Sequence, residues 1–235
     1  GSQTTKRLLS FTPLLQLETL FVLDEAGRIL STREPHASPG PAFSLIRDAK
    51  SCAWGVNSRV ASELADHLNA LAREEPPLSA HFEAPRHAAS YVRLLGGKVG
   101  SGPVFTFPTT LPASAGVVEV TALSMLQAHF RGWTAEELPE RSPIIASVID
   151  GQAVSVCFCA RRSHVAAEAG VETAAAFRGR GLGPNVTAAW ARMIRESGRL
   201  PLYSTSWKNG PSRALAKTLR LFACGVDWSV YAALG

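Results

Sequence analysis

The sequence has little that would suit a membrane-spanning, secreted or disulfide-bonded protein. It has no apolar run near the roughly 18 to 20 residues that a membrane span needs. Its N-terminus lacks the basic-then-apolar layout of a secretory signal. The four cysteines among 235 residues are scattered, which is too few for a disulfide framework in a chain of this size. We therefore expect a soluble, cytoplasmic protein with reduced thiols.

Long basic runs are also missing, although the net charge is +5. Arg161-Arg162 and Arg178-x-Arg180 are the two places where arginines come close together. A general nucleic-acid surface usually gathers Lys and Arg on one stretch and interleaves them with aromatic residues. We therefore expect neither a nucleic-acid nor a membrane partner, and the positive charge would suit a phosphorylated cofactor.

The sequence offers no convincing set of metal ligands. Cys157 and Cys159 lie in the apolar run 153–160, where an extended strand would place both side chains on one side, so we expect both thiols to be buried core residues. A metal would need further ligands, and none lies nearby. The histidines with the same lack of partners are interpreted as half-buried packing residues, namely His67, His81, His87 and His129.

The N-terminal part reads as a small α/β unit. Residues 19–34 contain two β-prone runs around 24–27, which predicts a hairpin. Helical spacing of apolar residues from Ser58 to Pro76 predicts an amphipathic helix capped by Asn57 or Ser58. The glycine-rich stretch 96–103 is the clearest break in composition. We therefore divide the chain into residues 1–100, a smaller N-terminal α/β domain, and residues 101–235.

The second part alternates strands and helices, which is typical of a sheet with helices packed on its faces. Asp150-Gly151 predicts a tight hairpin turn, and Leu215, Leu219 and Phe222 are expected to point inward from one helix. The expected strands are 144–149, 153–160, 166–175, 200–207 and 226–233, and the expected helices are 121–130, 183–196 and 211–222.

The stretch Arg178-Gly179-Arg180-Gly181-Leu182-Gly183 carries the chemistry. A glycine-rich turn from a strand into a helix lets backbone N–H groups converge, and the helix dipole adds positive potential, so the turn would bind an anion such as pyrophosphate. Neither frame of this turn matches the G-x-G-x-x-G dinucleotide fingerprint, and the Gly-Lys-Ser/Thr of a P-loop is missing.

The spacing R-x-x-G-x-G resembles that of the GNAT superfamily of acetyl-CoA-dependent acetyltransferases. The likeness continues in the strand before it (167–173), the helix around Trp190, the strand 202–207 and Asn209-x-x-Ser212. It implies an α/β (α+β) fold, with a mixed central sheet whose strands splay and are flanked by helices. The implied activity is transfer of an acetyl group from acetyl-CoA to a small-molecule or peptide amine.

The resemblance also implies a cofactor site. The backbone amides of Gly179, Arg180, Gly181, Leu182 and Gly183 would bind the pyrophosphate, supported by the side chains of Arg178 and Arg180. The backbone of Val171 and Thr173 would pair with the pantetheine arm in the gap between the splayed strands. Asn209 and Ser212 would contact the cofactor, although capping of the following helix would explain them equally well.

The family's reaction needs a base for the amine and an acid for the leaving thiolate. Glu168 is the first candidate base because it lies in a small, apolar stretch where burial would raise its pKa. Glu172 is the second. The family's frequent acid, a tyrosine seven residues after the asparagine, is replaced by Ala216, so Tyr203, Ser204 and Ser206 are the substitutes.

Several alternatives remain at the level of sequence. A non-catalytic acyl-CoA sensor would explain Ala216, and a longer acyl chain or a hydroxyl acceptor is equally compatible with the motifs. The N-terminal domain would cap the acceptor side of the cleft. Trp54, Tyr91 and Trp133 could line an acceptor pocket, but core packing is the preferred interpretation. A homodimer is compatible with the sequence, which does not determine the oligomeric state.

Overall fold

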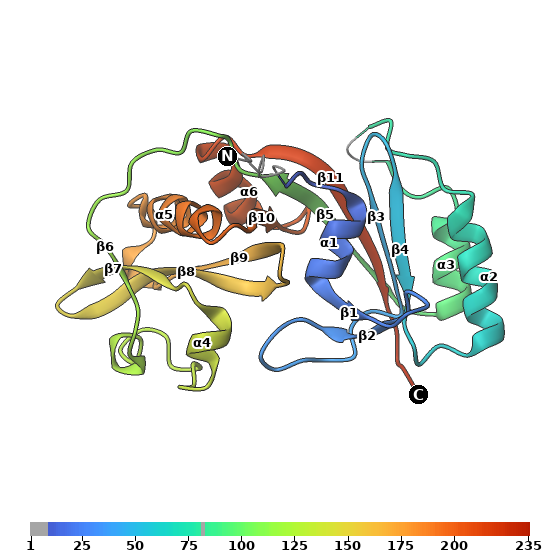
Figure 1. The fold of residues 1–235 in the computed structure, drawn as a ribbon, viewed down its shortest axis with the longest axis horizontal. Coiled ribbons are helices and arrows are strands. Elements are labelled where there is room, and N and C mark those ends of the chain that lie inside the picture. Colours follow the sequence, from blue (N-terminus) through green and yellow to red (C-terminus); the bar gives the residue numbers. More distant parts are fainter. Residues whose placement is uncertain (1–8, 81–82) are drawn as a thin grey trace, which may run out of the picture.

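The computed structural model describes residues 9–80 and 83–235, so His81 lies outside the described residues. Its main feature is a mixed sheet of nine strands in the order β4-β3-β11-β5-β10-β9-β8-β7-β6, flanked by helices (Figure 1). The fold is therefore mixed α+β, as predicted. Within the described ranges, no helix is long and apolar enough to cross a membrane.

The first part of the chain supplies three strands of the large sheet and a separate hairpin. Its elements are α1 (Pro13–Leu20), β1 (Phe21–Leu23), β2 (Ile29–Thr32), β3 (Phe43–Arg47), β4 (Cys52–Val56), α2 (Ser62–Arg73), α3 (Ala88–Leu95) and β5 (Lys98–Thr106). The predicted hairpin is confirmed, because β1 and β2 pair antiparallel. Its turn is held by the Asp24 carboxylate, which accepts hydrogen bonds from the backbone N–H groups of Ala26 and Arg28.

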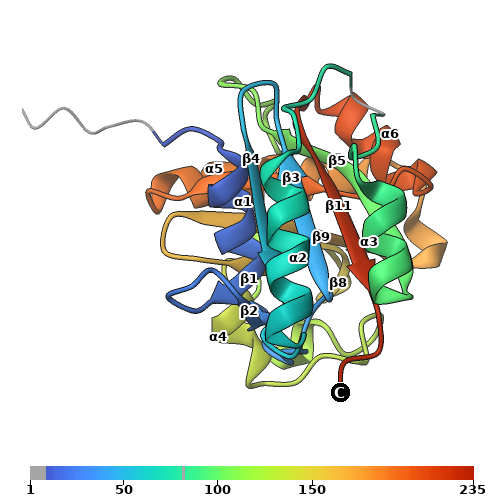
Figure 2. The ribbon, with the colours of Figure 1, turned by 90° about the vertical axis from the view of Figure 1, so that its right-hand side faces the viewer.

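Helix α2 is confirmed, but it begins four residues later than Ser58 and lacks a side-chain cap. The Asn57 side chain is used elsewhere, since it donates to the carbonyl groups of Pro39 and Pro41 and accepts from the N–H of Arg59. The predicted caps are therefore wrong, because Asn57 closes the turn that precedes the helix. Helices α2 and α3 cover one face of β3, β4 and β11 (Figure 2).

The aromatic residues proposed for packing do pack. Tyr91 is fully buried and stacks on Phe43, with ring centroids 4.4 Å apart. Trp54 belongs to the same core, and Trp133 packs edge-on against Phe158. Among the histidines, His67 and His129 are exposed, so the interpretation of these two as half-buried packing residues is wrong.

Strand β5 runs through most of the glycine-rich stretch 96–103, which the sequence indicated as a break in composition. Gly102 within the strand and Gly97 just before it allow close approach of other backbone segments. A Cβ at Gly102 would lie 1.5 Å from the carbonyl oxygen of Thr205, and one at Gly97 would lie 2.2 Å from that of Tyr231. Any larger residue would push these segments away. The predicted domain boundary near residue 100 falls inside this strand.

The second part of the chain supplies the rest of the sheet. Its elements are β6 (Val117–Glu119), η1 (Leu123–Met125), α4 (Glu137–Arg141), β7 (Ile145–Ile149), β8 (Gln152–Arg162), β9 (Ala166–Thr173), η2 (Ala175–Phe177), α5 (Leu182–Glu196), β10 (Leu200–Ser204), α6 (Gly210–Thr218) and β11 (Phe222–Tyr231). The turn at Asp150-Gly151 is confirmed, with φ of 52° and 75° as a type I′ turn requires.

Two expectations in this part are wrong. The predicted helix 121–130 is reduced to the short 3-10 helix η1 and further turns, although Leu126 and Phe130 are buried as the pattern indicated. Phe222 does not point inward from a helix: α6 ends at Thr218, and Phe222 opens β11 with 68% of its surface exposed.

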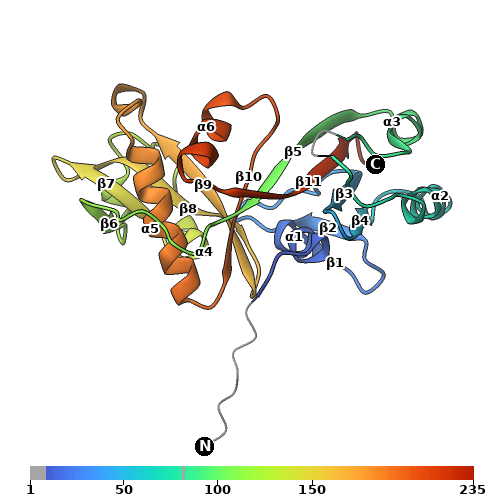
Figure 3. The same cartoon turned by 90° about the horizontal axis from the view of Figure 1, so that it is seen from above.

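The sheet has two distinct faces. Helix α5 packs on one face of β8 and β9, over a core that contains both Cys157 and Cys159, which are buried as predicted. Helix α1 lies on the other face and contacts β3, β4, β8 and β9, so it bridges strands on both sides of β10 and β5 (Figure 3). We call this second side the α1 face.

Candidate active site

Strands β9 and β10 separate in the middle of the sheet. They pair in parallel from Ala166–Leu200 to Glu168–Leu202, and beyond Leu202 strand β10 pairs only with β5 on its other edge. Strand β9 continues to Thr173 with β8 on its other side only. The predicted splay is confirmed, and it leaves one edge of β9 available for hydrogen bonds with an extended ligand.

A cavity of about 1190 Å³ opens at this splay. Its wall is built from the end of β9, the glycine turn, the first turn of α5, the end of β10 and the start of α6. The predicted site residues on this wall are Val171, Glu172, Thr173, Arg178, Gly179, Gly181, Leu182, Gly183, Tyr203, Asn209 and Ser212. Two predicted site residues, Glu168 and Arg180, do not line it.

The glycine turn is shaped to present its backbone N–H groups. Gly179 and Gly181 adopt φ of 76° and 75°, a left-handed conformation that favours glycine. Within the described part of the chain, the N–H groups of residues 179–181 have no hydrogen-bond acceptor, and α5 begins without a side-chain cap. A Cβ at either glycine would meet nothing within 4 Å. This arrangement fits a bound pyrophosphate.

The two arginines of the turn differ in position. Arg178 lines the cavity while its Nε donates to the carbonyl of Thr173 at 3.1 Å. Arg180 bonds the carbonyl of Ala176 at 3.3 Å, and its guanidinium lies 5.1 Å from the ring centroid of Phe177. Arg178 is therefore the guanidinium that the structure places on the cavity wall.

The opposite wall carries a buried hydroxyl pair. Tyr203 is 4% exposed, and its hydroxyl group is hydrogen-bonded to Ser212 Oγ and donates to the Ser212 carbonyl at 3.2 Å. Burial raises the pKa of Tyr203. Asn209 accepts from the N–H of Ser212 at 3.1 Å, which confirms the capping interpretation. Contact of Asn209 and Ser212 with a cofactor stays a prediction.

Residues 144–231, which include the splay, the glycine turn and both helices at the cavity, match the GNAT acetyltransferase family. This part of the chain is a GNAT acetyltransferase domain. No curated protein matches the chain.

Several solved structures are similar to this chain at low sequence identity. A GNAT-family protein from Novosphingobium aromaticivorans has 18% identity and a TM-score of 0.47 over 58% of this chain and 66% of its own. An acetyltransferase of the GNAT family from Colwellia psychrerythraea has 12% identity and a TM-score of 0.43, over 62% and 63%. A GCN5-related N-acetyltransferase from Sphaerobacter thermophilus has 13% identity and a TM-score of 0.44, over 91% and 80%. The chain thus spans just under two thirds of the length of the first two.

On the α1 face of the GNAT domain, Glu168 lies in a mixed group of charged and polar residues. Its Oε2 accepts a hydrogen bond of 2.8 Å from Nε2 of Gln16, a fully buried residue of α1. We call this group the α1-face cluster. Its members other than Glu168 and Gln16 interact electrostatically with one another. The cluster consists of Glu34, Arg161, Glu168, Asp227, Tyr231 and Gln16.

Sequence reasoning missed two residues of this region. Asp227 lies in β11 between the buried residues Val226 and Trp228, and burial together with the negative charge of Glu168 raises its pKa to about 7. A lone carboxylate in an apolar strand was the available sign. His129 lines the GNAT-domain cavity and lies edge-on to Phe177 with ring centroids 5.5 Å apart, which the sequence did not indicate.

Proposed function

We propose that the protein is an acetyl-CoA-dependent N-acetyltransferase that transfers the acetyl group to an amine by direct attack. The observation that carries this proposal is the cavity at the splay of β9 and β10, which connects the glycine turn to the gap in the sheet. A phosphate-binding turn at one end and an unpaired strand edge leading away from it suit a long ligand with an anionic head and an amide-bearing arm.

The chain's own residues would hold the donor in three places. The N–H groups of residues 179–183 bind the pyrophosphate, with Arg178 beside them. The backbone of Val171 and Thr173 pairs with the arm. Asn209 and Ser212 border the same cavity from α6. Acetyl-CoA supplies the activated acetyl thioester at the inner end.

The reaction then needs proton transfers on the two sides of the gap. A carboxylate on the α1 face, for which Glu168 and Glu172 were the predicted candidates, takes a proton from the incoming ammonium. Tyr203 lies on the cavity side and donates a proton to the leaving sulfur. Its hydroxyl group is protonated at neutral pH, and burial raises its pKa further above the ordinary tyrosine value.

Calorimetric titration with acetyl-CoA tests the binding half of this proposal. Wild-type protein should bind, whereas Gly181→Glu should lose at least about 100-fold in affinity, since a carboxylate would occupy the site of the pyrophosphate. Gly198→Glu is a matched control at the other end of α5: Gly198 has φ of 86° and, like Gly181, nothing within 4 Å of an added Cβ. It carries the same backbone strain and should bind like wild type.

Two outcomes would contradict the assignment of the site. Lack of binding to wild type at millimolar acetyl-CoA would leave the turn with a purely structural role. Equal loss in both variants would mean that strain, and not the anion cradle, explains the effect. Titration with longer acyl-CoA thioesters alongside acetyl-CoA establishes the acyl length.

A non-catalytic acyl-CoA sensor is the second candidate, and one observation favours it. Ala216 occupies the position of the family's frequent tyrosine acid, and it is 2% exposed within the core under α5 and α6. Release of free thiol from acetyl-CoA on addition of amines distinguishes the two candidates. An enzyme releases thiol in proportion to the acetylated amine, whereas a sensor binds acetyl-CoA without turnover.

A further inference from the structure

Asp227 and Glu168 come from distant strands but point to the same side of the sheet. On β11, Trp228 packs in the core under α2 and α3, so the neighbouring Asp227 points to the α1 face. On β9, Ala167 and Ala169 pack in the core under α5, so Glu168 also points to the α1 face. The two carboxylates interact, since the charge of Glu168 contributes to the raised pKa of Asp227.

Gly102 links the wall of the cavity to Asp227. In the register of β11 and β5, Asp227 stands opposite Gly102. The missing side chain of Gly102 lets the backbone of Thr205 lie over it, since a Cβ there would be 1.5 Å from the Thr205 oxygen. Thr205 and Ser206 in turn line the cavity. The wall of the donor site therefore passes directly next to Asp227.

The α1-face cluster has more negative than positive groups around the pair of Asp227 and Glu168. Arg161 lies 3.8 Å from Glu34 and also acts on Asp227, whose pKa it lowers, so one guanidinium stands against the carboxylates of Glu34, Glu168 and Asp227. Tyr231, on the same strand as Asp227, is a neutral hydroxyl group whose pKa is raised by burial and by Asp227. The hydroxyl group of Ser229 approaches Asp227 Oδ1 at 3.3 Å and holds it only weakly. An ammonium group is the ligand that such a pair favours.

A separate sign of a ligand comes from Gln16. This fully buried residue donates its Nε2 to Glu168, while its Oε1 is buried and, within the described residues, has no hydrogen-bond partner. A buried amide oxygen without a donor costs roughly 1 to 3 kcal/mol. A donor group that enters beside Glu168 would satisfy it.

We propose that Asp227 is the carboxylate that takes the proton from the ammonium of the acceptor, while Glu168 and Gln16 hold that ammonium in place. This assignment rests on the proposed function and names a protonated primary amine as the acceptor. One ammonium proton passes to Asp227 and the neutral nitrogen forms a bond to the acetyl carbon. The carbon–sulfur bond breaks and the sulfur takes one proton from the Tyr203 hydroxyl group. The second nitrogen proton restores that hydroxyl group, so the products are the amide, the free thiol and one proton held by Asp227, which passes to solvent.

The pH dependence of kcat/KM distinguishes Asp227 from Glu168. The assay uses acetyl-CoA and a panel of primary amines from 1-aminobutane to 1,4-diaminobutane and spermidine. Thiol release measures the rate at each pH from 5.5 to 9. For the best amine, the kcat/KM of the wild type should rise with pH along a limb whose midpoint lies near pH 7, as the pKa of Asp227 requires. Asp227→Asn should lose this limb and fall about 100-fold in kcat/KM.

Glu168→Gln should keep the limb but move it to lower pH, because it removes the negative charge that raises the pKa of Asp227. Asp66→Asn, an exposed aspartate on α2, should leave the profile unchanged. The assignment is wrong if Glu168→Gln loses the limb while Asp227→Asn keeps it. Absence of thiol release with every amine, in a protein that binds acetyl-CoA, identifies the non-catalytic sensor and overturns the proposed enzyme together with this assignment. Absence of acetyl-CoA binding overturns the proposed function instead.

The melting temperature shows whether Asp227→Asn acts through folding. Burial raises the pKa of Asp227 from 3.8 to about 7 in the folded state, so the folded protein loses stability as pH rises between these two values. The amide removes this loss. At pH 8 the variant should therefore melt no lower than wild type, and a low activity together with an unchanged or higher melting temperature assigns the defect to chemistry.

Discussion

Tyr203 is the candidate for the proton donor that the family usually supplies as a tyrosine, because it carries a buried hydroxyl group at the cavity. It lies on β10, where the strand leaves β9, and its hydroxyl group pairs with Ser212 at the start of α6. Ala216 lies one turn further along α6 and is buried, so the hydroxyl group comes from the strand and not from the helix. We infer that this protein supplies the same proton from a different element.

Replacing Tyr203 by Phe tests this inference. The variant keeps the ring, which packs 6.2 Å from that of Phe105, and removes only the hydroxyl group. We expect kcat to fall about 100-fold, a typical contribution of a general acid, with little change in the dissociation constant of acetyl-CoA. Steady-state thiol release together with calorimetry measures both. An unchanged kcat would assign the proton to another donor, with Ser204 and Ser206 next in line.

At the scale of single residues, the sequence predicted those features that depart from ordinary local preference. Three glycines between a strand and a helix indicated an anion site, and all three line the cavity. Asp227 was missed for a physical reason. A strand pattern shows that neighbouring side chains alternate, but it does not show that β9 and β11 turn their carboxylates toward the same face.

At the scale of elements, the regular patterns held and the irregular ones did not. Helix α5 and the hairpin of β7 and β8 were predicted because their periodicity and turn residues are local properties. Strand β5 was missed because the glycine-rich stretch 96–103 is typical of a break between elements. In the structure, Gly102 admits the backbone of Thr205, and Gly97, just before the strand, admits that of Tyr231. Contacts of this kind depend on the packing of distant segments, which composition does not reveal.

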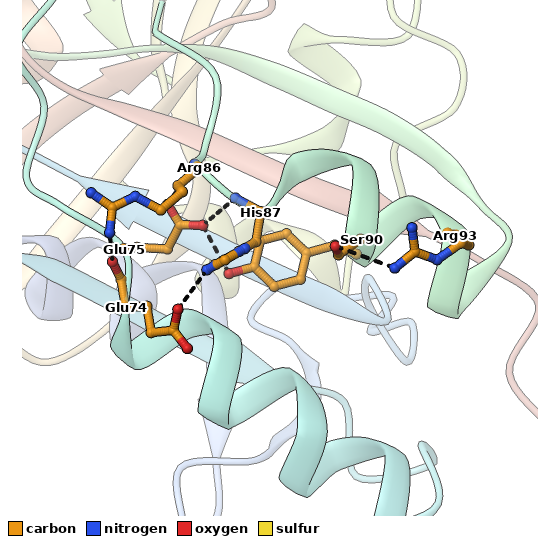
Figure 4. A network of polar contacts seen from close by, with 7 residues as sticks. Glu74, Glu75, Arg86, His87, Ser90 and Arg93 are labelled. Atoms are coloured by element: carbon orange, nitrogen blue, oxygen red, sulfur yellow. Dashed lines mark hydrogen bonds and ion pairs between the residues drawn. The ribbon is translucent and has the colours of Figure 1, made fainter.

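One carboxylate ties α2 to α3. Glu75, which follows α2, is 8% exposed and accepts hydrogen bonds from the N–H groups of Arg86 and His87 at 2.7 and 2.8 Å and from the Tyr91 hydroxyl at 3.0 Å (Figure 4). Burial and the charge of Glu75 raise the pKa of Tyr91. These bonds fix the N-terminal end of α3 against the end of α2.

Glu75→Gln should therefore lower the free energy of unfolding by about 2 to 3 kcal/mol, since a neutral amide replaces a charged acceptor of three bonds. Urea denaturation measures this change. Glu74→Gln is the matched control: its side chain is 60% exposed and its ion pair with His87 should contribute less than about 1 kcal/mol. Similar losses in both variants would contradict the proposed role of Glu75 in tying α2 to α3. A change in acetyl-CoA affinity for Glu75→Gln would contradict it too.

At the scale of the whole molecule, the first and second parts of the chain are interleaved in one sheet. The last strand, β11, lies between β3 and β5 and pairs with both. Strand β5 also pairs with β10, beside the splay. The sequence suggested two units that meet near residue 100, because local patterns carry no information on strand order. The GNAT domain instead inserts its final strand among strands of the N-terminal part.

We expect this interleaving to make the molecule unfold as one unit. Urea unfolding followed by pulsed hydrogen exchange and mass spectrometry reports on β3 and on α5 separately, and both should show the same midpoint. Acetyl-CoA at about 100 times its dissociation constant should stabilise both by about 2.7 kcal/mol, although its site lies in the second part. Gly181→Glu, which cannot bind it, should show neither shift. If β3 unfolds first and ignores the ligand, the chain consists of two units that unfold independently, and the strand pairing of β11 does not couple them.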